Sequence, residues 1–280
     1  MIDASPLDLD LDTATDARLA AALAAGAGAR LLELRRRLDG SDFDADDLRR
    51  TGDRSGHEYL AARLAEHRPG DAVLSEEAVD DGRRLVADRV WIVDPLDGTR
   101  EFAERREDGS WRDDFAVHVA LWQRGRGLTD GAVALPARSR VYASDEPATV
   151  GGSPAEEVLA GRRRLRLAAS RTRPPEVVRR LVERGDAELV AMGSCGIKAI
   201  SVLEGVADAY IHAGGQFEWD SAAPVAVVTA GGLVATRLDG SPLEYNRADP
   251  SLPDLLVCRP RLVSLVRELV ETVAAEATAG

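Results

Sequence analysis

The second half of the chain alternates short apolar strand patterns with helical patterns, and this alternation most narrowly limits the folds open to it. It favours an α/β arrangement, in which helices pack on the faces of a sheet. The first half instead begins with two helical patterns and continues with a run of strand patterns. We therefore expect an α+β N-terminal half and an α/β C-terminal half, divided near residue 150, where polar residues, Gly and Pro replace the apolar runs.

The expected units are a disordered tail over residues 1–15, the α+β half over 16–150 and the α/β half over 151–280. The helices are expected over residues 16–38, 54–67, 175–184, 195–205, 219–230 and 260–275. The strands are expected over residues 72–74, 89–93, 115–122, 131–135, 140–143, 165–169, 188–192, 209–212, 233–236 and 255–258.

The acidic composition limits the classes of partner. A formal net charge of −12 over 280 residues leaves no basic surface for nucleic acid. The N-terminus lacks the features of a signal peptide, and the Ala-rich stretch over 19–34 is too short and too polar to span a bilayer. Cys195 and Cys258 have no metal-ligand spacing and are interpreted as reduced packing thiols. We expect a cytoplasmic protein that binds neither nucleic acid nor membrane.

The segment Trp91-Ile-Val-Asp-Pro-Leu-Asp-Gly-Thr99 contains the strongest functional signal. An apolar strand leads directly into Asp94 and Asp97, so both carboxylates are expected at the carboxyl end of a strand, where α/β folds place their sites. Gly98-Thr99 is expected to begin a helical turn with free N–H groups. Glu76 follows another strand pattern, and Asp220 opens a helical pattern after a Gly-rich loop.

Four carboxylates at one place would repel each other strongly without a cation. Oxygen ligands at this density suit Mg²⁺, which prefers carboxylates, a carbonyl and retained waters. The sequence therefore predicts a magnesium site built from Glu76, Asp94, Asp97 and Asp220. His57, His67 and His118 are interpreted as surface or packing residues, whereas His212 lies near the predicted site.

The order of these motifs resembles the inositol monophosphatase superfamily, the lithium-sensitive, Mg²⁺-dependent phosphatases. The matching residues span most of the chain and are Asp53, Glu76-Glu77, Asp94–Thr99, Trp219-Asp220 and Gly231-Gly232. The resemblance implies a layered αβαβα sandwich, two or three Mg²⁺ ions and a homodimer. It also implies that Glu76, Asp94, the Leu96 carbonyl, Asp97 and Asp220 bind the metal. Glu76 and Thr99 would position the attacking water, and Asp53 would hold the Thr99 hydroxyl.

Within the superfamily, the chain is most similar to the CysQ-type 3'(2'),5'-bisphosphate nucleotidases of sulfur metabolism. The similar segments are Asp97-Gly-Thr-Arg-Glu-Phe102, Ser170-Arg-Thr172 and Gly193-Ser-Cys-Gly-Ile-Lys198. The resemblance implies conversion of adenosine 3',5'-bisphosphate to AMP and phosphate, and action on its sulfated precursor. The residues expected to contact this phosphorylated small molecule are Gly98, Thr99, Arg100, Arg171, Ser194, Lys198 and Asp220.

Two other functions remain open. One is an inositol-1-phosphatase or fructose-1,6-bisphosphatase activity. The other is a relative that has lost catalysis and serves as a binding or regulatory protein. The departures from the nucleotidase pattern, in the loop over 212–218 and the insertion over 104–113, flank the expected substrate site. Lys198 is the only lysine among 36 basic residues, which suggests a position that needs a compact ammonium group.

Overall fold

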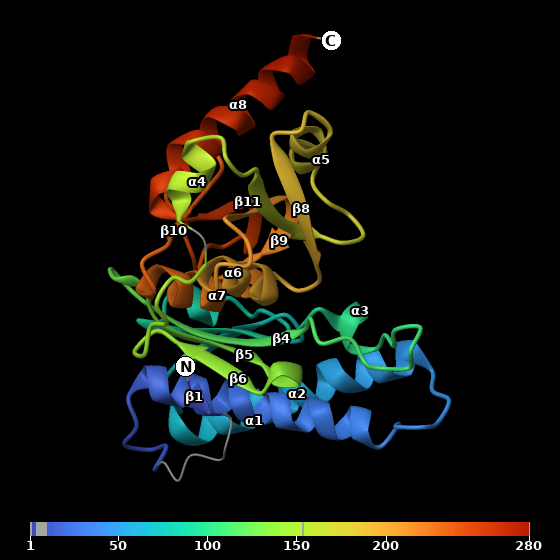
Figure 1. Ribbon diagram of the computed structural model, residues 1–280. Helices are drawn as coiled ribbons and strands as arrows, with labels where there is room; N and C mark the ends of the chain where they lie inside the picture. Colours follow the sequence, from blue (N-terminus) through green and yellow to red (C-terminus); the bar gives the residue numbers. More distant parts are fainter. Residues whose placement is uncertain (1, 4–9, 153, 280) are drawn as a thin grey trace.

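The computed structural model describes residues 2–3, 10–152 and 154–279. Over these residues the chain forms five layers, helix–sheet–helix–sheet–helix, as Figure 1 shows, and this confirms the expected αβαβα sandwich. The helices are α1 (Asp16–Arg36), α2 (Ala45–His67), α3 (Thr99–Phe102), α4 (Ala155–Leu159), α5 (Glu176–Glu183), α6 (Cys195–Leu203), α7 (Glu218–Ala230) and α8 (Val263–Ala279). The strands are β1 (Ile2–Asp3), β2 (Ala72–Ser75), β3 (Arg89–Asp97), β4 (Ala116–Gln123), β5 (Gly127–Leu135), β6 (Arg140–Ala143), β7 (Leu165–Ser170), β8 (Ala187–Met192), β9 (Ala209–Phe217), β10 (Val234–Thr236) and β11 (Ser251–Cys258).

Helices α1 and α2 cover the outer face of a sheet with the strand order β1-β6-β5-β4-β3-β2. Strands β2 and β3 are parallel, and the other neighbours in this sheet are antiparallel. Strand β4 has buried apolar residues on both of its faces, with His118 as the polar exception on the inward face, so helices cover the sheet on either side. Val117, Val119 and Leu121 pack under α1, whereas Ala116 and Ala120 face α6 and α7.

Helix α2 begins at Ala45, nine residues before the expected start. The Asp44 carboxylate caps it by accepting hydrogen bonds from the N–H groups of Asp46 and Asp47. The part of the helix that the sequence interpretation missed includes Gly52, which lowers the intrinsic helix propensity, and Gly56 lies within the part that was expected. Both are packed tightly: a Cβ on Gly56 would lie 3.0 Å from Pro95, and one on Gly52 would lie 2.8 Å from a Leu96 methyl group. The two glycines therefore let α2 approach the end of β3.

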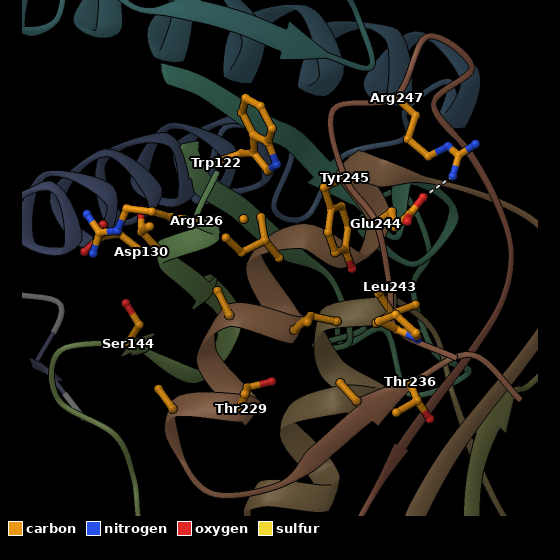
Figure 2. A pocket seen from close by; sticks show the side chains of 18 of the residues that line it. Trp122, Arg126, Asp130, Ser144, Thr229, Thr236, Leu243, Glu244, Tyr245 and Arg247 are labelled. Carbon is orange, nitrogen blue, oxygen red and sulfur yellow. Dashed lines mark hydrogen bonds and ion pairs between the residues drawn. The ribbon is translucent and has the colours of Figure 1, made fainter. Parts of the chain in front are cut away.

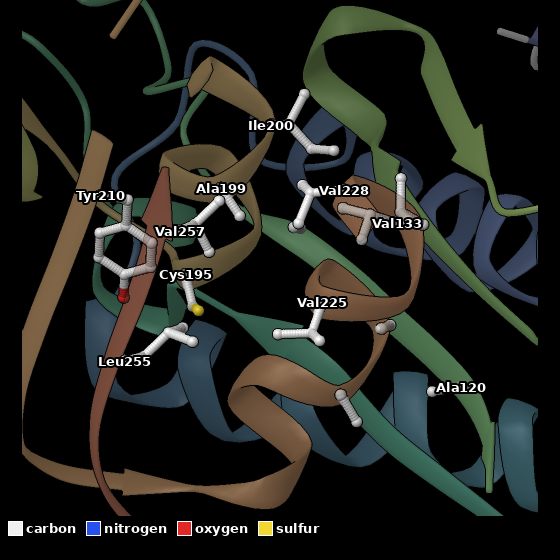
Figure 3. Packing of buried hydrophobic residues seen from close by; sticks show 14 of the residues in the cluster. Ala120, Val133, Cys195, Ala199, Ile200, Tyr210, Val225, Val228, Leu255 and Val257 are labelled. Carbon is white, nitrogen blue, oxygen red and sulfur yellow. The ribbon is translucent and has the colours of Figure 1, made fainter. Parts of the chain in front are cut away.

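Helices α6 and α7 lie between the two sheets, and their buried side chains form the central core shown in Figure 3. The core draws on both halves of the chain, for example Val133 from β5, Ile200 from α6 and Leu255 from β11. The predicted division near residue 150 stays a prediction. The chain passes from one sheet to the other between β6 and β7, and the short helix α4 forms in this connection, just after the expected division.

The second sheet has the strand order β10-β11-β9-β7-β8 and is covered on its outer face by α4, α5 and α8. The expected loop over 213–217 was wrong, because these residues extend β9 and pair with β11 as far as Phe217 opposite Ser251. Strands β5 and β11 likewise begin four residues earlier than expected. In the expected tail, Ile2 pairs with Val141 as strand β1, so that part of the prediction was also wrong, while residues 1 and 4–9 lie outside the described residues.

Candidate active site

Asp94 and Asp97 lie at the carboxyl end of β3, as expected. The strand itself continues to Asp97, four residues beyond the expected end. Its pairing with β4 passes from Asp94 opposite His118 to Asp97 opposite Ala116, with an irregularity between these pairs. Two residues of β3, Pro95 and Leu96, thus oppose the single residue Val117. This extra residue bends the strand and brings both carboxylates to one place.

Asp220 completes a group of three carboxylates with Asp94 and Asp97. Their ligand oxygens all lie within 4.8 Å of one another. A backbone N–H orients each carboxylate: Leu96 N–H donates to Asp94 Oδ1 at 3.0 Å, Gly196 N–H to Asp97 Oδ2 at 2.8 Å, and Phe217 N–H to Asp220 Oδ2 at 2.7 Å. Each carboxylate keeps a second oxygen for another ligand, which is the arrangement that a metal centre requires.

The electrostatics of the group also favour a cation. Burial and the charges of Asp97, Glu76 and Asp220 raise the pKa of Asp94 well above its usual range. Burial, followed by the charge of Asp97, raises the pKa of Asp220 to about 7. Both raised pKa values mean that the ionised forms of Asp94 and Asp220 are unfavourable without a cation beside them. A divalent cation among the carboxylates would remove that cost.

Glu76 lies on the loop after β2, at the edge of this group. The residue is exposed, whereas Asp94 and Asp97 are buried. Loss of hydration raises the pKa of its carboxyl to about 8, and the charges of Asp220 and of the other nearby carboxylates, Glu77, Asp53 and Asp97, add to the shift. The four carboxylates expected from the sequence therefore form a group of three, of which Asp94 and Asp97 are buried and Asp220 is half-buried, with Glu76 as an exposed fourth member.

Thr99 and Asp53 face each other across the packing of α2 on β3. Burial raises the pKa of Asp53 to about 7, the charge of Glu77 adds to this, and a hydrogen bond with the Thr99 side chain opposes it. The Thr99 hydroxyl also lies 3.1 Å from the Leu96 carbonyl oxygen. The hydroxyl has one hydrogen for these two acceptors, so a cation that engaged the Leu96 carbonyl would leave this hydrogen to Asp53.

Gly98 connects β3 to α3 in a conformation that favours glycine. Its φ is +89°, and a Cβ would lie 3.1 Å from the Asp114 carbonyl oxygen. Any side chain here would therefore be strained. Arg100, one residue further than Thr99, is exposed on α3.

Ser194 and Arg171 already have protein partners. The Ser194 hydroxyl donates to Asp97 Oδ2 at 2.5 Å and accepts from Ile197 N–H at 3.1 Å, although its own φ is +52°. Its geometry therefore orients Asp97. Arg171 forms an ion pair with Asp114 and lies 3.4 Å from Glu101 Oε1. The predicted substrate contacts of both residues stay predictions.

Lys198 is buried in the first turn of α6, with its Nζ 5.1 Å from the centre of the Tyr210 ring. Its charge reaches the site, because it opposes the rise in the pKa of Asp220. Burial lowers the pKa of His212 to about 4, and the Lys198 charge adds to this shift. Lys198 therefore places a positive charge beside the carboxylates on the C-terminal side.

His118 is the site residue that sequence reasoning missed. It is fully buried, its Nδ1 lies 3.3 Å from the Trp219 carbonyl oxygen, and its Nε2 lies 3.3 Å from Asp97 Oδ2. Burial lowers its pKa and favours the neutral ring, while the Asp97 charge acts in the opposite direction. The missed signal was strand alternation, because His118 shares the inward face of β4 with Ala116 and Ala120. Gly196 leaves room for the ring, since a Cβ there would lie 2.3 Å from His118 Nε2.

One cavity among the described residues lies away from the carboxylates. It is a groove of about 1070 Å³ between the hairpin of β4 and β5, the second half of α7 and the segment over 240–247. Figure 2 shows Trp122 and Tyr245 on its walls, with Arg247 turned toward Glu244. Cys195 and Cys258 are free and buried, as expected. A search of the described residues finds no helix of the length and apolar character that a membrane span requires.

Comparison with family models matches residues 10–272 to the inositol monophosphatase family. The chain belongs to this family. The match spans both halves and includes every residue of the carboxylate group. It confirms the resemblance inferred from the motifs, and this family is metal-dependent.

Relatives of known name place the chain within the family. The 3'-phosphoadenosine 5'-phosphate phosphatase of Mycobacterium leprae (strain TN) is 51% identical over 272 residues, which cover 91% of this chain and 94% of that protein. The 3'(2'),5'-bisphosphate nucleotidase CysQ of Escherichia coli O157:H7 is 30% identical over 231 residues, covering 78% and 85%. The solved structure of CysQ from Bacteroides thetaiotaomicron matches with a TM-score of 0.70 and 27% identity, covering 87% of this chain and 97% of that chain. The expected likeness to the CysQ-type branch is confirmed.

Proposed function

We propose that this family member is a Mg²⁺-dependent phosphatase that converts adenosine 3',5'-bisphosphate to AMP and phosphate. The observation that carries the reaction type is the group of three carboxylates, each held by a backbone N–H with a second oxygen available. The similarity to the Mycobacterium leprae protein, at 51% identity, supports the choice of substrate.

The donor atoms of the site fit Mg²⁺. Asp94, Asp97, Asp220, Glu76 and the Leu96 carbonyl offer only oxygen, the ligand type that Mg²⁺ prefers. The raised pKa values of Asp94, Asp220 and Glu76 show a charge excess that the cation would neutralise. When bound, Mg²⁺ would offset the phosphate charge and make a bound water more acidic. We propose two or three ions.

The remaining residues orient the reactants. In this proposal Thr99 accepts a hydrogen bond from the attacking water, while its own hydrogen is held by Asp53. Glu76, at the open edge of the group, contacts the same water. A water held in this way attacks phosphorus in line with the leaving 3'-oxygen, so no covalent intermediate with the enzyme is needed.

The second phosphate distinguishes this substrate from a monophosphate. We assign it to Lys198, whose charge lies near Asp220 but on the C-terminal side of the site. Arg171 would join it by exchanging its pairing with Glu101, and Gly98, Arg100 and Ser194 complete the proposed substrate contacts. The two free cysteines support a reducing, cytoplasmic setting. The expected homodimer stays a prediction that sedimentation analysis would test.

Phosphate release from a panel of substrates tests the function. With Mg²⁺, we expect adenosine 3',5'-bisphosphate to have the highest kcat/KM, ahead of inositol-1-phosphate and fructose-1,6-bisphosphate. We also expect lithium to inhibit the reaction, as the resemblance implies. Preference for either other substrate would contradict the substrate assignment, and release from none would favour a relative without catalysis.

Changing Lys198 to methionine tests the second-phosphate site. Methionine keeps much of the apolar stem but removes the charge. We expect kcat/KM for adenosine 3',5'-bisphosphate to fall by about 1.5–3 kcal/mol, or roughly 10–150-fold, the range for a charge-assisted hydrogen bond. The value for 3'-AMP should barely change, because this substrate lacks the second phosphate. Steady-state kinetics with both substrates measures the difference.

The same comparison separates binding from folding. If Lys198 only supports the core through Tyr210, the variant should lose thermal stability and lose activity equally on both substrates. Equal losses, or no loss on either substrate, would thus remove Lys198 from the substrate site.

A further inference from the structure

The proposed metal ligands lie on segments that the rest of the protein holds in place to different degrees. Asp94 and Asp97 lie in β3, and Asp220 lies in the first turn of α7. Glu76 instead begins a loop in which every residue from 76 to 81 is exposed. An exposed loop has no packing to hold a carboxylate in place, so a specific anchor is needed for Glu76 to stay near Asp220.

Arg84 is the buried group at the end of this loop. Its residue is only 1% exposed, in the short 3₁₀ turn Arg83–Leu85. Its guanidinium pairs with Asp80 of the loop, with Nε 2.9 Å and Nη2 2.8 Å from Asp80 Oδ2. Both nitrogens approach the same carboxylate oxygen, and the Nε–H donates the hydrogen bond, so a charge-assisted contact joins the loop to this buried guanidinium.

The other edge of the same guanidinium reaches the C-terminal half. Arg84 Nη1 donates to Asn246 Oδ1 at 2.9 Å and to the Arg247 carbonyl oxygen at 2.8 Å. The Asn246 amide donates back to the Arg84 carbonyl oxygen at 3.2 Å. Asn246 has a φ of +60°, so its backbone is held in a conformation that non-glycine residues seldom adopt.

Residues 246 and 247 in turn hold the beginning of α7. Asn246 N–H donates to Glu218 Oε2 at 2.6 Å, and Arg247 N–H donates to Glu218 Oε1 at 2.8 Å. Glu218 is 1% exposed and lies two residues before Asp220. On its far side this segment forms part of the wall of the groove, where Arg247 turns its side chain toward Glu244 (Figure 2). Hydrogen bonds thus run from Asp80 through Arg84 and residues 246–247 to Glu218.

We propose that Arg84 is a positioning residue that sets the separation of Glu76 and Asp220, and through it the affinity of the site for Mg²⁺. The inference rests on the proposed function in one respect, that these two carboxylates bind the metal. Replacing a residue that contacts a metal ligand, but not the metal itself, typically lowers metal affinity or activity by about 10–100-fold.

Two substitutions test the proposal from the two sides of one contact. Arg84→Met removes the guanidinium and keeps most of its apolar stem, and Asp80→Asn removes the carboxylate that Arg84 holds. Calorimetric titration with Mg²⁺ should show a dissociation constant raised about tenfold in Arg84→Met and raised by a smaller factor in Asp80→Asn. At saturating Mg²⁺, kcat should return to within about twofold of the wild-type value, because the ligands themselves are intact.

Two control variants remove the same groups elsewhere. Asp81 is the next residue of the loop, but its partner is the exposed Arg83, so Asp81→Asn removes the same charge without touching Arg84. Arg259 is also a buried arginine, just after β11 and near Asp208, so Arg259→Met reports the general cost of losing a buried guanidinium. Both controls should bind Mg²⁺ within about twofold of wild type, even where Arg259→Met lowers Tm.

The outcomes are separable. Unchanged Mg²⁺ affinity in Arg84→Met and Asp80→Asn, or an equal weakening in Asp81→Asn, would overturn the proposal. Should Arg84→Met fail to fold, the comparison of Asp80→Asn with Asp81→Asn decides alone. Failure of the proposed function would instead appear in the wild-type protein, as absence of Mg²⁺ binding or of phosphate release.

Discussion

Replacing Asp94 with asparagine is expected to lower kcat/KM by at least about a hundredfold and to leave the protein folded. A neutral amide is a poor Mg²⁺ ligand, and a hundredfold loss corresponds to about 2.7 kcal/mol of lost transition-state stabilisation. Asp220→Asn should behave in the same way, because both carboxylates belong to the same group. Phosphate release at millimolar Mg²⁺ measures the effect.

Thermal unfolding with and without Mg²⁺ provides the control. Mg²⁺ should raise the Tm of the wild type, because it binds the native state, and should not raise the Tm of Asp94→Asn. With EDTA present, the variant should be at least as stable as the wild type, since it lacks a buried charge that its neighbours repel. Asp130→Asn, on β5 at the remote groove, should keep both activity and the Mg²⁺ response. Near-wild-type turnover in Asp94→Asn would contradict the metal assignment.

Thr99→Ala is expected to lower kcat by about a hundredfold with little change in KM. The loss is in water positioning, which matters in the transition state, and not in the binding of phosphate. Thr99→Ser keeps the hydroxyl and should retain most of the activity. Steady-state kinetics with adenosine 3',5'-bisphosphate separates the two parameters. A change confined to KM would show that Thr99 only holds the substrate.

The partnership with Asp53 can be measured in the same experiment. If Asp53 acts by holding the Thr99 hydroxyl, the double variant Asp53→Asn with Thr99→Ala should lose no more activity than the more damaging single variant. Additive losses would instead show that Asp53 acts independently of Thr99, for example on the charge of the neighbouring Glu77.

The expected bounds of the helices and strands were accurate where the neighbouring residues give clear turn signals. The strand over 140–143 was placed correctly, because alternating apolar residues end there at clear turn signals. Helix α2 was placed nine residues short, since Gly52 looks unfavourable for a helix until its packing against Leu96 is known. The glycines of β9 similarly suggested a loop, whereas pairing with β11 keeps that backbone extended.

The site was predictable where its geometry is local. Asp94, Asp97 and Thr99 lie within six residues, and the strand that precedes them already implies that the two carboxylates stand together at its end. Asp220 was included because it opens a helical pattern after a Gly-rich loop, and the resemblance to a family supported this, but no local pattern contains its distance from β3. Strand alternation places His118 on the inward face of β4, but its contact with Asp97 depends on the pairing of β3 with β4, which local sequence does not contain.

The sequence by itself determined the layered α/β class, the acidic ligand set and the turn after β3, because these follow from the order and periodicity of neighbouring residues. Only the tertiary structure decided how the ligands are supported. Arg84 meets Asn246 across 162 residues of chain, and together with the backbone of residue 247 they join the loop of Glu76 to the helix of Asp220. A contact between segments so far apart depends on how both sheets pack on α6 and α7, and local sequence contains no measure of that packing.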